Sequence, residues 1–247
     1  MLRFGKQAPV RFKDALYLKD VQAEALPKPK GVFGFGTLFK DWGMLGNDQV
    51  GDCAEAGTAH EVMLDTKVGG HPASFSTESV LGFYSEVTGY DPEDPNTDQG
   101  TQVVSMMDYR RRTGIADVKG VRHKIVLAVR CPIDYPTFQS AVYTFGQVGV
   151  GFNVPESAME QFNAGRPWKY IGDHNIVGGH YVCGVGSMKP DSENTVVTWG
   201  RRQVMERDFF EAYVDELWVP LSSEIERNGK GLHALDWAKV VSLAEGL

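Results

Sequence analysis

Cysteine is scarce in this sequence, since the chain of 247 residues has three, Cys53, Cys131 and Cys183. An odd, small number of cysteines excludes a disulfide framework and favours a reducing compartment. Long apolar runs are also missing, because no stretch approaches the roughly 18 residues of a membrane-spanning helix. Residues 1–20 carry scattered charges, unlike a secretory signal. A cytoplasmic protein that does not bind membranes is therefore expected.

Positive charge is in deficit as well, with 25 basic against 32 acidic residues and a net charge of −7. Broad binding to DNA or RNA depends on an excess of cations, so no nucleic-acid partner is expected. The compact basic run Arg110–Arg112 is interpreted as the solvated end of a helix, ahead of a contact with phosphate or an acidic partner. Aspartates cluster in residues 90–98, but the prolines there and the missing glycine pattern disagree with an EF-hand. Neither a metal nor a cofactor is expected.

Glycine is abundant, with 28 residues, which suggests many turns and close approaches of the backbone. Residues 1–46 are rich in proline, glycine and lysine with isolated aromatic residues, which indicates an extended arm lying across a folded body at 47–247. In that body, composition and periodicity predict helices from about residue 53 and at 76–87, 102–112, 135–145 and 209–214, and strands at 124–129, 149–154, 180–185, 195–199 and 216–219.

The predicted helices and strands are segregated along the chain, with helices dominating the first half and strands the second. Such segregation favours an α+β domain with a cleft between two lobes. We expect a helical lobe over about residues 47–120, a β-rich lobe over about 121–225 and a C-terminal tail over 226–247.

Cys53 is the first residue with chemical promise, because it follows a turn and begins a run of helical composition. The free N–H groups at a helix start favour a thiolate, and Asp52 is expected to cap this helix. Cys131 and Cys183 are expected in the core. A nearby imidazolium would activate the thiol further, and His180 stands out among six histidines because two glycines precede it and a strand follows.

Five motifs appear in a fixed order along the chain: Gly46–Gly57 (GNDQVGDCAEAG), Thr97–Thr101 (TDQGT), Asp134–Val154, Gly178–Gly186 (GGHYVCGVG) and Val196–Gly200 (VVTWG). Their order and the separation of about 130 residues between cysteine and histidine resemble the papain-like cysteine peptidase superfamily over about residues 42–220. The resemblance implies a papain-like two-lobed fold, with a helical N-terminal lobe, a β-rich C-terminal lobe and a cleft between them.

The same resemblance implies roles for residues of the site. Cys53 would attack a carbonyl, and His180 would take the proton and return it to the leaving amine. The main-chain N–H of Cys53 would hold the oxyanion together with an amide side chain. That amide is Asn47, at the family's spacing before the cysteine, or Gln49, with the family's side chain at a different spacing. Gly100, Gly179 and Trp199 would line the substrate cleft.

The sequence departs from the family at the residue that orients the histidine. The family has an asparagine there, whereas this chain has Val197, followed by Thr198 with a hydroxyl group. His180 must therefore be held by Thr198, by Asn175, by Asp173, by a main-chain carbonyl or by water. This departure puts catalysis in question more than it does the fold.

Three functions remain open. The leading hypothesis is a papain-like cysteine peptidase or amide hydrolase with a protein or peptide substrate. The arm at residues 1–46 would partly cover the cleft of this enzyme. A peptidoglycan or transacylating enzyme of the NlpC type also has an Asp-Cys pair, like Asp52–Cys53, but its domain is shorter and its cysteine and histidine lie closer together. The third is a catalytically impaired papain-fold binding or structural module, which the loss of the orienting asparagine favours. The chain, especially GNDQVGDC after an arm that ends in DWGML, also resembles uncharacterised papain-like proteins encoded by bacteriophages and actinobacteria. A host-cytoplasm or virion location would follow from that origin, and the sequence carries no signal for an oligomeric state.

Overall fold

The computed structural model describes residues 2–10, 17–18, 26–226, 232 and 242. The expected C-terminal tail and much of the expected arm lie outside these residues. The described helices are α2 (Cys53–Gly69), α3 (Thr77–Thr88), α4 (Val103–Arg112), α5 (Tyr135–Phe145), α6 (Glu156–Asn163) and α7 (Arg207–Tyr213), with short 3-10 turns η1 (Pro95–Thr97) and η2 (Ser223–Ile225). Among the described residues, none of the helices is both long and apolar enough to span a bilayer.

One twisted antiparallel sheet forms the second half of the fold, in the order β4-β9-β5-β6-β7-β8, with β1 added beside β6. Its strands are β1 (Phe33–Gly34), β4 (Leu127–Arg130), β5 (Val148–Pro155), β6 (Ile176–Ser187), β7 (Glu193–Thr198), β8 (Arg201–Glu206) and β9 (Val214–Leu221). A separate small hairpin pairs β2 (Ile115–Ala116) with β3 (Arg122–His123). The chain is therefore a mixed helix and sheet protein, as expected.

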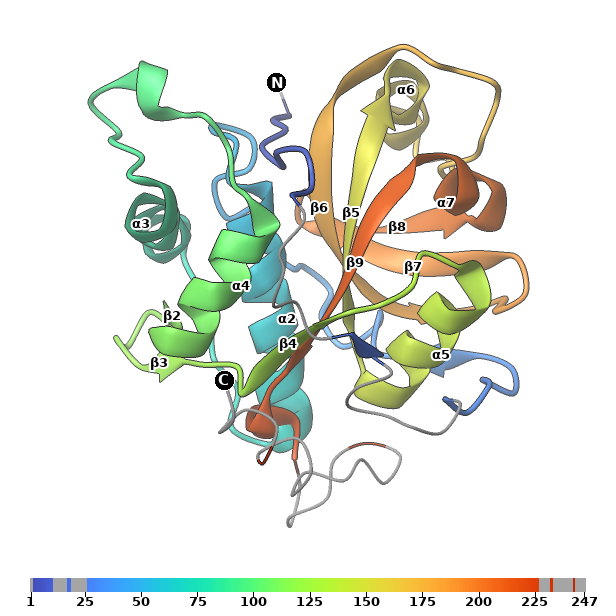
Figure 1. The fold of residues 1–247 in the computed structure, drawn as a ribbon, viewed down its shortest axis with the longest axis horizontal. Coiled ribbons are helices and arrows are strands. Elements are labelled where there is room, and N and C mark those ends of the chain that lie inside the picture. Colours follow the sequence, from blue (N-terminus) through green and yellow to red (C-terminus); the bar gives the residue numbers. More distant parts are fainter. Residues whose placement is uncertain (1, 11–16, 19–25, 227–231, 233–241, 243–247) are drawn as a thin grey trace.

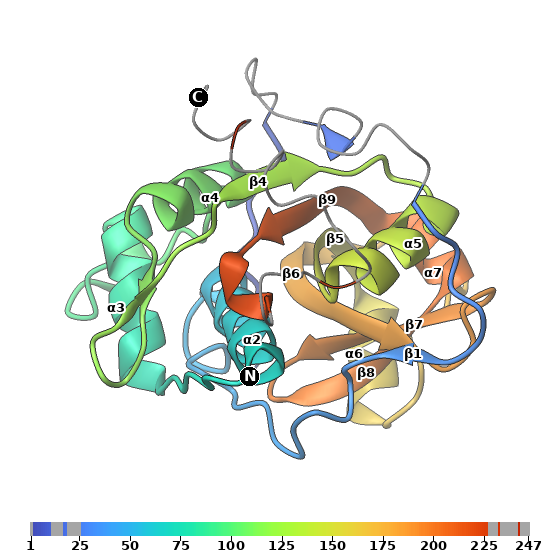
Figure 2. The ribbon, with the colours of Figure 1, turned by 90° about the horizontal axis from the view of Figure 1, so that it is seen from below.

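The long helix α2 lies between the other helices of its lobe and the sheet (Figures 1 and 2). Most of its residues are buried, because α3 and α4 pack on one side and β6 on the other. Gly57 permits the close approach to β6, since a Cβ at this position would lie 2.7 Å from the Tyr181 ring. The helix ends at Gly70, whose left-handed φ of 91° is a conformation that glycine adopts without strain.

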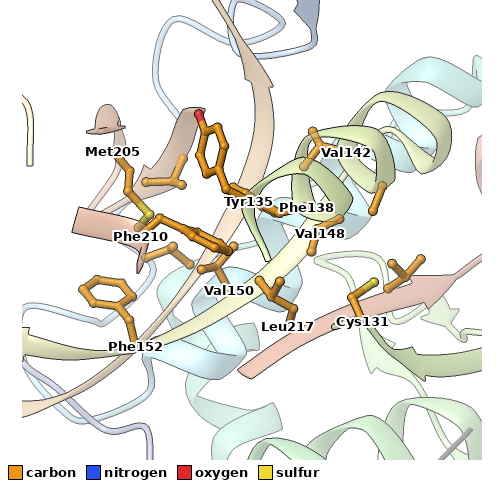
Figure 3. Packing of buried hydrophobic residues seen from close by; sticks show 14 of the residues in the cluster. Cys131, Tyr135, Phe138, Val142, Val148, Val150, Phe152, Met205, Phe210 and Leu217 are labelled. Carbon is orange, nitrogen blue, oxygen red and sulfur yellow. The ribbon is translucent and has the colours of Figure 1, made fainter. Parts of the chain in front are cut away.

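The β-rich half has its own apolar core between α5, α7 and the sheet (Figure 3). Phe138 of α5 stacks on Phe210 of α7, with ring centroids 4.9 Å apart, above Val150 of β5. Burying a side chain of this size contributes about 1.5–3 kcal/mol, so this core fixes the sheet whose central strands are β5 and β6.

Arg110 corrects one expectation from the sequence. The run Arg110–Arg112 was expected to be solvated, but Arg110 is buried and donates to Glu61 of α2 at 2.6 Å. A buried carboxylate needs a partner, and Glu61 also accepts a hydrogen bond from the Tyr181 hydroxyl at 2.8 Å. The pair ties α4 to α2 and β6. Of the run, Arg112 is exposed and pairs with Asp108 one helical turn earlier.

Candidate active site

Cys53 is the first residue of α2, at the edge of the helix that faces the sheet, and only 1% of it is exposed. Asp52 stands at the N-cap position, but its carboxylate makes no capping hydrogen bond, which corrects the expectation that it caps the helix. Burial, and next the proximity of Glu55, raise the pKa of Asp52 well above its usual range. The Asp52 side chain therefore does not occupy the main-chain N–H of Cys53, whereas the N–H of Glu55 donates to the carbonyl of Asp52 at 3.0 Å.

His180 lies on β6 with its imidazole fixed on several sides. The ring stacks on Trp199 with centroids 4.4 Å apart and an interplanar angle of 18°, and the edges of Phe4 and Phe152 contact it. Nε2 is 2.7 Å from the hydroxyl oxygen of Thr198. Nδ1 is buried and has no hydrogen-bond partner in the described part of the chain. When Nε2 donates to Thr198, Nδ1 carries the lone pair that accepts a proton.

The strand β6 and the start of α2 bring the two sequence-predicted residues into one region. The main chain of Tyr181, the residue after His180, lies within hydrogen-bonding range of the Cys53 thiol, and so does that of Gly5. Thr198 lies on β7, which pairs with β6 so that Cys183 faces Val197, and this pairing holds Thr198 near His180. Thr198 therefore supplies the contact to the histidine, as one of the alternatives had it.

Asn175 and Asp173 make other contacts. The Asn175 amide donates to Glu156 at 2.9 Å, and the Asp173 carboxylate accepts from the main chain of Ser157 at 2.8 Å, at the start of α6. They stabilise the loop before β6, and of the three side-chain alternatives Thr198, Asn175 and Asp173 it is Thr198 that reaches the His180 ring.

The structure distinguishes between the two amide side chains, Asn47 and Gln49, that were expected to stabilise the oxyanion. Asn47 is buried, with its amide nitrogen 3.4 Å from the carbonyl oxygen of Val50 and its side chain beside Asp52. Gln49 is exposed to solvent. The structure thus brings Asn47, and not Gln49, toward the start of α2.

The cleft segment, which we define as Leu2–Gln7, covers this region by running between α4 and β6 (Figure 1). Its main chain is bonded on both sides. The N–H of Lys6 donates to the carbonyl of Gly179 at 3.0 Å, and the N–H of Thr101 donates to the carbonyl of Gly5 at 2.6 Å. A groove of about 570 Å³ remains along the segment, lined by residues 98–100 and 177–179.

Glycines make this close fit possible. A Cβ on Gly5 would lie 1.6 Å from the carbonyl oxygen of Gly51, and a Cβ on Gly100 would lie 2.0 Å from the carbonyl oxygen of Gly5. On the opposite edge, a Cβ on Gly179 would lie 2.2 Å from the carbonyl oxygen of Lys6. The sequence-predicted cleft residues Gly100 and Gly179 therefore flank an extended peptide, which in this structure belongs to the chain itself.

The electrostatic state of the covered site is neutral. Burial raises the pKa of the Cys53 thiol to about 12, although the main chains of Tyr181 and Gly5 act in the opposite direction. Burial also lowers the pKa of His180 to about 3. In the covered state the pair is a thiol and a neutral imidazole, because the dry surroundings disfavour both charges.

The other histidine and cysteine residues considered from the sequence make contacts that stabilise the fold. His60 donates through Nε2 to the carbonyl of Gly43 at 3.0 Å and packs on Trp42. Cys131 and Cys183 belong to apolar clusters, as expected. No group of three or more histidine, cysteine, aspartate or glutamate side chains suited to a metal ion occurs among the residues described.

Sequence reasoning missed Phe4, Gly5 and Lys6 of the cleft segment. The local signal was a glycine between an aromatic and a basic residue, which becomes meaningful only once the segment is placed against residues more than a hundred positions away.

No protein-family model matches this chain, and no curated protein matches it. Solved structures do. The fold is similar to xylellain, a cysteine protease from Xylella fastidiosa, with a TM-score of 0.70, 16% identity, and coverage of 90% of this chain and 96% of that one. It is also similar to procathepsin B S9 from Trypanosoma congolense, with a TM-score of 0.58, 13% identity and coverage of 90% and 87%. For digestive procathepsin L2 proteinase from Tenebrio molitor larval midgut the TM-score is 0.60, the identity 14% and the coverage 85% and 74%.

Identities this low establish the fold and not the activity. The chain has the two-lobed papain-like α+β fold that the order of its motifs predicted.

Proposed function

We propose that this protein is a papain-like cysteine peptidase or amide hydrolase acting on a protein or peptide, with Cys53 as nucleophile and His180 as general base. One observation carries the proposal. The His180 ring is fixed by Thr198 and Trp199, with Nδ1 unpartnered among the described residues, on the strand against which the Cys53 end of α2 packs. A nucleophile at a helix start and a base held by a third group are the parts that acyl transfer requires.

The proposed reaction uses these groups in sequence. The sulfur of Cys53 forms a bond to the substrate carbonyl carbon while His180 takes the thiol proton. The Cys53 N–H and the Asn47 side chain stabilise the oxyanion, and the C–N bond breaks as His180 returns the proton to the leaving amine. Water, deprotonated by His180, then hydrolyses the thioester and frees the sulfur.

Thr198 supports this proposal in place of the family's asparagine. Its hydroxyl lies at hydrogen-bonding distance from Nε2 and fixes the ring plane, which is the task of the orienting residue. The hydroxyl is neutral and both donates and accepts, so it is compatible with imidazole and with imidazolium.

The cleft segment gives the proposed enzyme a covered resting state. It occupies the path between Gly100 and Gly179 with main-chain hydrogen bonds on both edges. A substrate peptide must displace it before the substrate carbonyl reaches Cys53. The three cysteines are unpaired, which supports the proposal of a reducing, cytoplasmic setting. A bacteriophage or actinobacterial origin stays a prediction, as does the division into lobes at about 47–120 and 121–225.

The experiment starts from the full chain carrying Gly5→Val, because any side chain at Gly5 collides with Gly51 and prevents seating of the segment. Denatured casein is incubated with this variant and the products are read by mass spectrometry. The matched controls are Gly5→Val/Cys53→Ala and Gly5→Val/His180→Ala. We expect internal cleavage with the first variant and none with either control. A folded Gly5→Val protein without products would contradict the proposal.

The second candidate is a papain-fold binding or structural module without catalysis. The observation that favours it is the replacement of the orienting asparagine by Val197 and Thr198, together with a neutral, covered Cys53. A thiol in the uncovered variant that reacts only at high pH, regardless of His180, would support this candidate.

A further inference from the structure

Lys6 of the cleft segment places a cation inside the protein. Its side chain is 1% exposed, and Nζ lies 3.0 Å from Asp215 Oδ2 and 3.6 Å from Glu216 Oε1. The remaining described contact of Nζ is the carbonyl of Gln7 at 3.2 Å. Lysine is rarely buried unless it is paired, so this lysine occupies a site that recognises its charge.

The space for the lysine stem is built by glycine. A Cβ on Gly151 of β5 would lie 2.8 Å from Cδ of Lys6 and 2.6 Å from Cγ of Glu216. The pairing of β5 with β9 sets Gly151 opposite Glu216, so the acidic side chain stands beside this gap. Any larger residue at Gly151 would fill the channel through which a long, straight side chain reaches the carboxylates.

The charges around the pocket leave one negative charge for a ligand. Arg130 approaches the other oxygen of Glu216 at 3.9 Å, and the indole N–H of Trp218 donates to that oxygen at 2.9 Å. Two carboxylates and one guanidinium thus require one further cation, which Lys6 supplies. Asp215 Oδ1 and Glu216 Oε1 are buried without a hydrogen-bond partner among the described residues, so acceptors are available for the several donors of a guanidinium as well as for an ammonium.

We propose that Asp215 and Glu216 form a specificity pocket for a lysine or arginine side chain of the substrate peptide, and that Lys6 fills this pocket while the cleft is covered. The proposal rests on the proposed function, whose cleft it shares. Lys6 follows Gly5, the residue whose main chain lies at the Cys53 thiol, so the pocket is about one residue away from the nucleophile along a bound peptide. A neutral side chain of equal length would leave both carboxylates facing an apolar group.

Binding of a peptide in trans tests the pocket without relying on catalysis. The full chain carrying Gly5→Val/Lys6→Ala has its segment displaced and its pocket vacant. Two fluorescein-labelled peptides with the sequence of residues 2–10 are compared by fluorescence anisotropy, one with lysine and one with norleucine at the position of Lys6. Norleucine keeps the aliphatic stem and lacks the ammonium. We expect the lysine peptide to bind at least about tenfold more tightly, because truncating one partner of a buried charge pair is costly.

Pocket variants complete the test. Glu216→Gln and Asp215→Asn, each added to Gly5→Val/Lys6→Ala, should reduce the preference for lysine, whereas Glu211→Gln, at an exposed position of α7, should leave it unchanged. Equal affinities of the two peptides, or no binding of the lysine peptide, would overturn the pocket. Gly5→Ala/Lys6→Ala serves as a second background, since a single Cβ already meets Gly51. A tenfold preference in binding without hydrolysis of any peptide would refute the proposed function and leave the pocket standing.

Discussion

Removal of the cleft segment should switch on the Cys53 thiol, and Gly5→Val is the perturbation that removes it. The Cβ of the new residue would lie 1.6 Å from the carbonyl oxygen of Gly51, a main-chain atom that cannot move away cheaply. The two hydrogen bonds that Lys6 and Gly5 make to the cleft edges are lost with it. Water then reaches a cysteine that is 1% exposed in the covered state.

The size of the effect follows from the thiol pKa. Burial raises this pKa from 9.0 to about 12, which lowers the thiolate fraction at neutral pH by about a thousandfold. Uncovering the site removes most of this penalty. It also raises the pKa of His180 from about 3, so that a thiolate–imidazolium pair can form at a pH below the ordinary thiol pKa.

Alkylation by iodoacetamide, followed by mass spectrometry between about pH 5 and pH 9, measures the thiolate directly. We expect slow labelling of Cys53 in the parent chain at every pH. In Gly5→Val we expect labelling on the order of a thousandfold faster at pH 7, persisting near pH 6. Adding His180→Ala should abolish the fast reaction near pH 6. The buried Cys131 and Cys183 serve as internal controls for unfolding.

Two results would refute this reasoning. Equal labelling rates in the parent and in Gly5→Val would mean that the segment does not protect the thiol. A pH profile that rises only near pH 9 and is unchanged by His180→Ala would mean that the histidine does not stabilise the thiolate, and catalysis by this pair would be excluded.

Three further predictions concern the support of the site. In the Gly5→Val chain, Thr198→Val removes the hydrogen bond to Nε2 and should lower kcat of the proposed reaction about tenfold with little change in KM, and Thr198→Ser should restore it, as steady-state kinetics would show. Arg110→Met leaves Glu61 buried without its counter-ion and should cost about 3–5 kcal/mol in urea unfolding, most of which Arg110→Met/Glu61→Gln recovers. Burial raises the pKa of Glu55 to about 8, so the folded state holds a proton that the unfolded state releases above about pH 4.5, and stability should fall as pH rises to 8. Glu55→Gln should remove this slope and be more stable than the parent at pH 8 by at most about 4 kcal/mol, measured by unfolding at pH 5 and pH 8.

Local signals made part of the fold predictable. The helix expected at 135–145 has the observed bounds Tyr135–Phe145, because Asp134 caps it and Pro136 suits its first turn. The helix expected from Cys53 begins there for a similar reason, since a glycine-rich turn precedes a run rich in alanine. These features act within a few residues, and a sequence displays them without knowledge of the fold.

Elements at the margins of the sheet escaped prediction. Strand β8 (Arg201–Glu206) lies at the edge of the sheet, and its sequence is mostly charged and polar, as suits a strand that pairs on one side only. Helix α6 (Glu156–Asn163) is short and follows Pro155 of β5 directly, with no separating turn residues. Neither the apolar periodicity nor turn chemistry marks such elements strongly.

The site divides in the same way. Cys53 and His180 were predicted because glycines and element boundaries mark them locally, and Thr198 because it follows Val197 at the place of the family's asparagine. Lys6 was missed because its partner Asp215 lies 209 positions later in the chain. Arg110 was misplaced because its charge looked solvated until α4 was set against Glu61. Long-range pairing of charges is a property of the folded state, and one sequence does not reveal it.

The cover and the pocket together set how a substrate would reach the nucleophile. In the proposed pair, transfer of the thiol proton from Cys53 to His180 is internal, so uncovering the site near neutral pH would take up no net proton, and pH would be a poor trigger there. Lys6, in contrast, is held in the pocket by charge. Because it belongs to the same chain, it competes with a substrate side chain for the pocket at an effective concentration of order millimolar. A peptide that presents its own lysine or arginine replaces the ammonium that it displaces, whereas a neutral peptide leaves the carboxylates unpaired. With the proposed function and pocket, access to Cys53 would therefore be selective for basic peptides before any bond is broken, and the covered state itself would contribute to specificity.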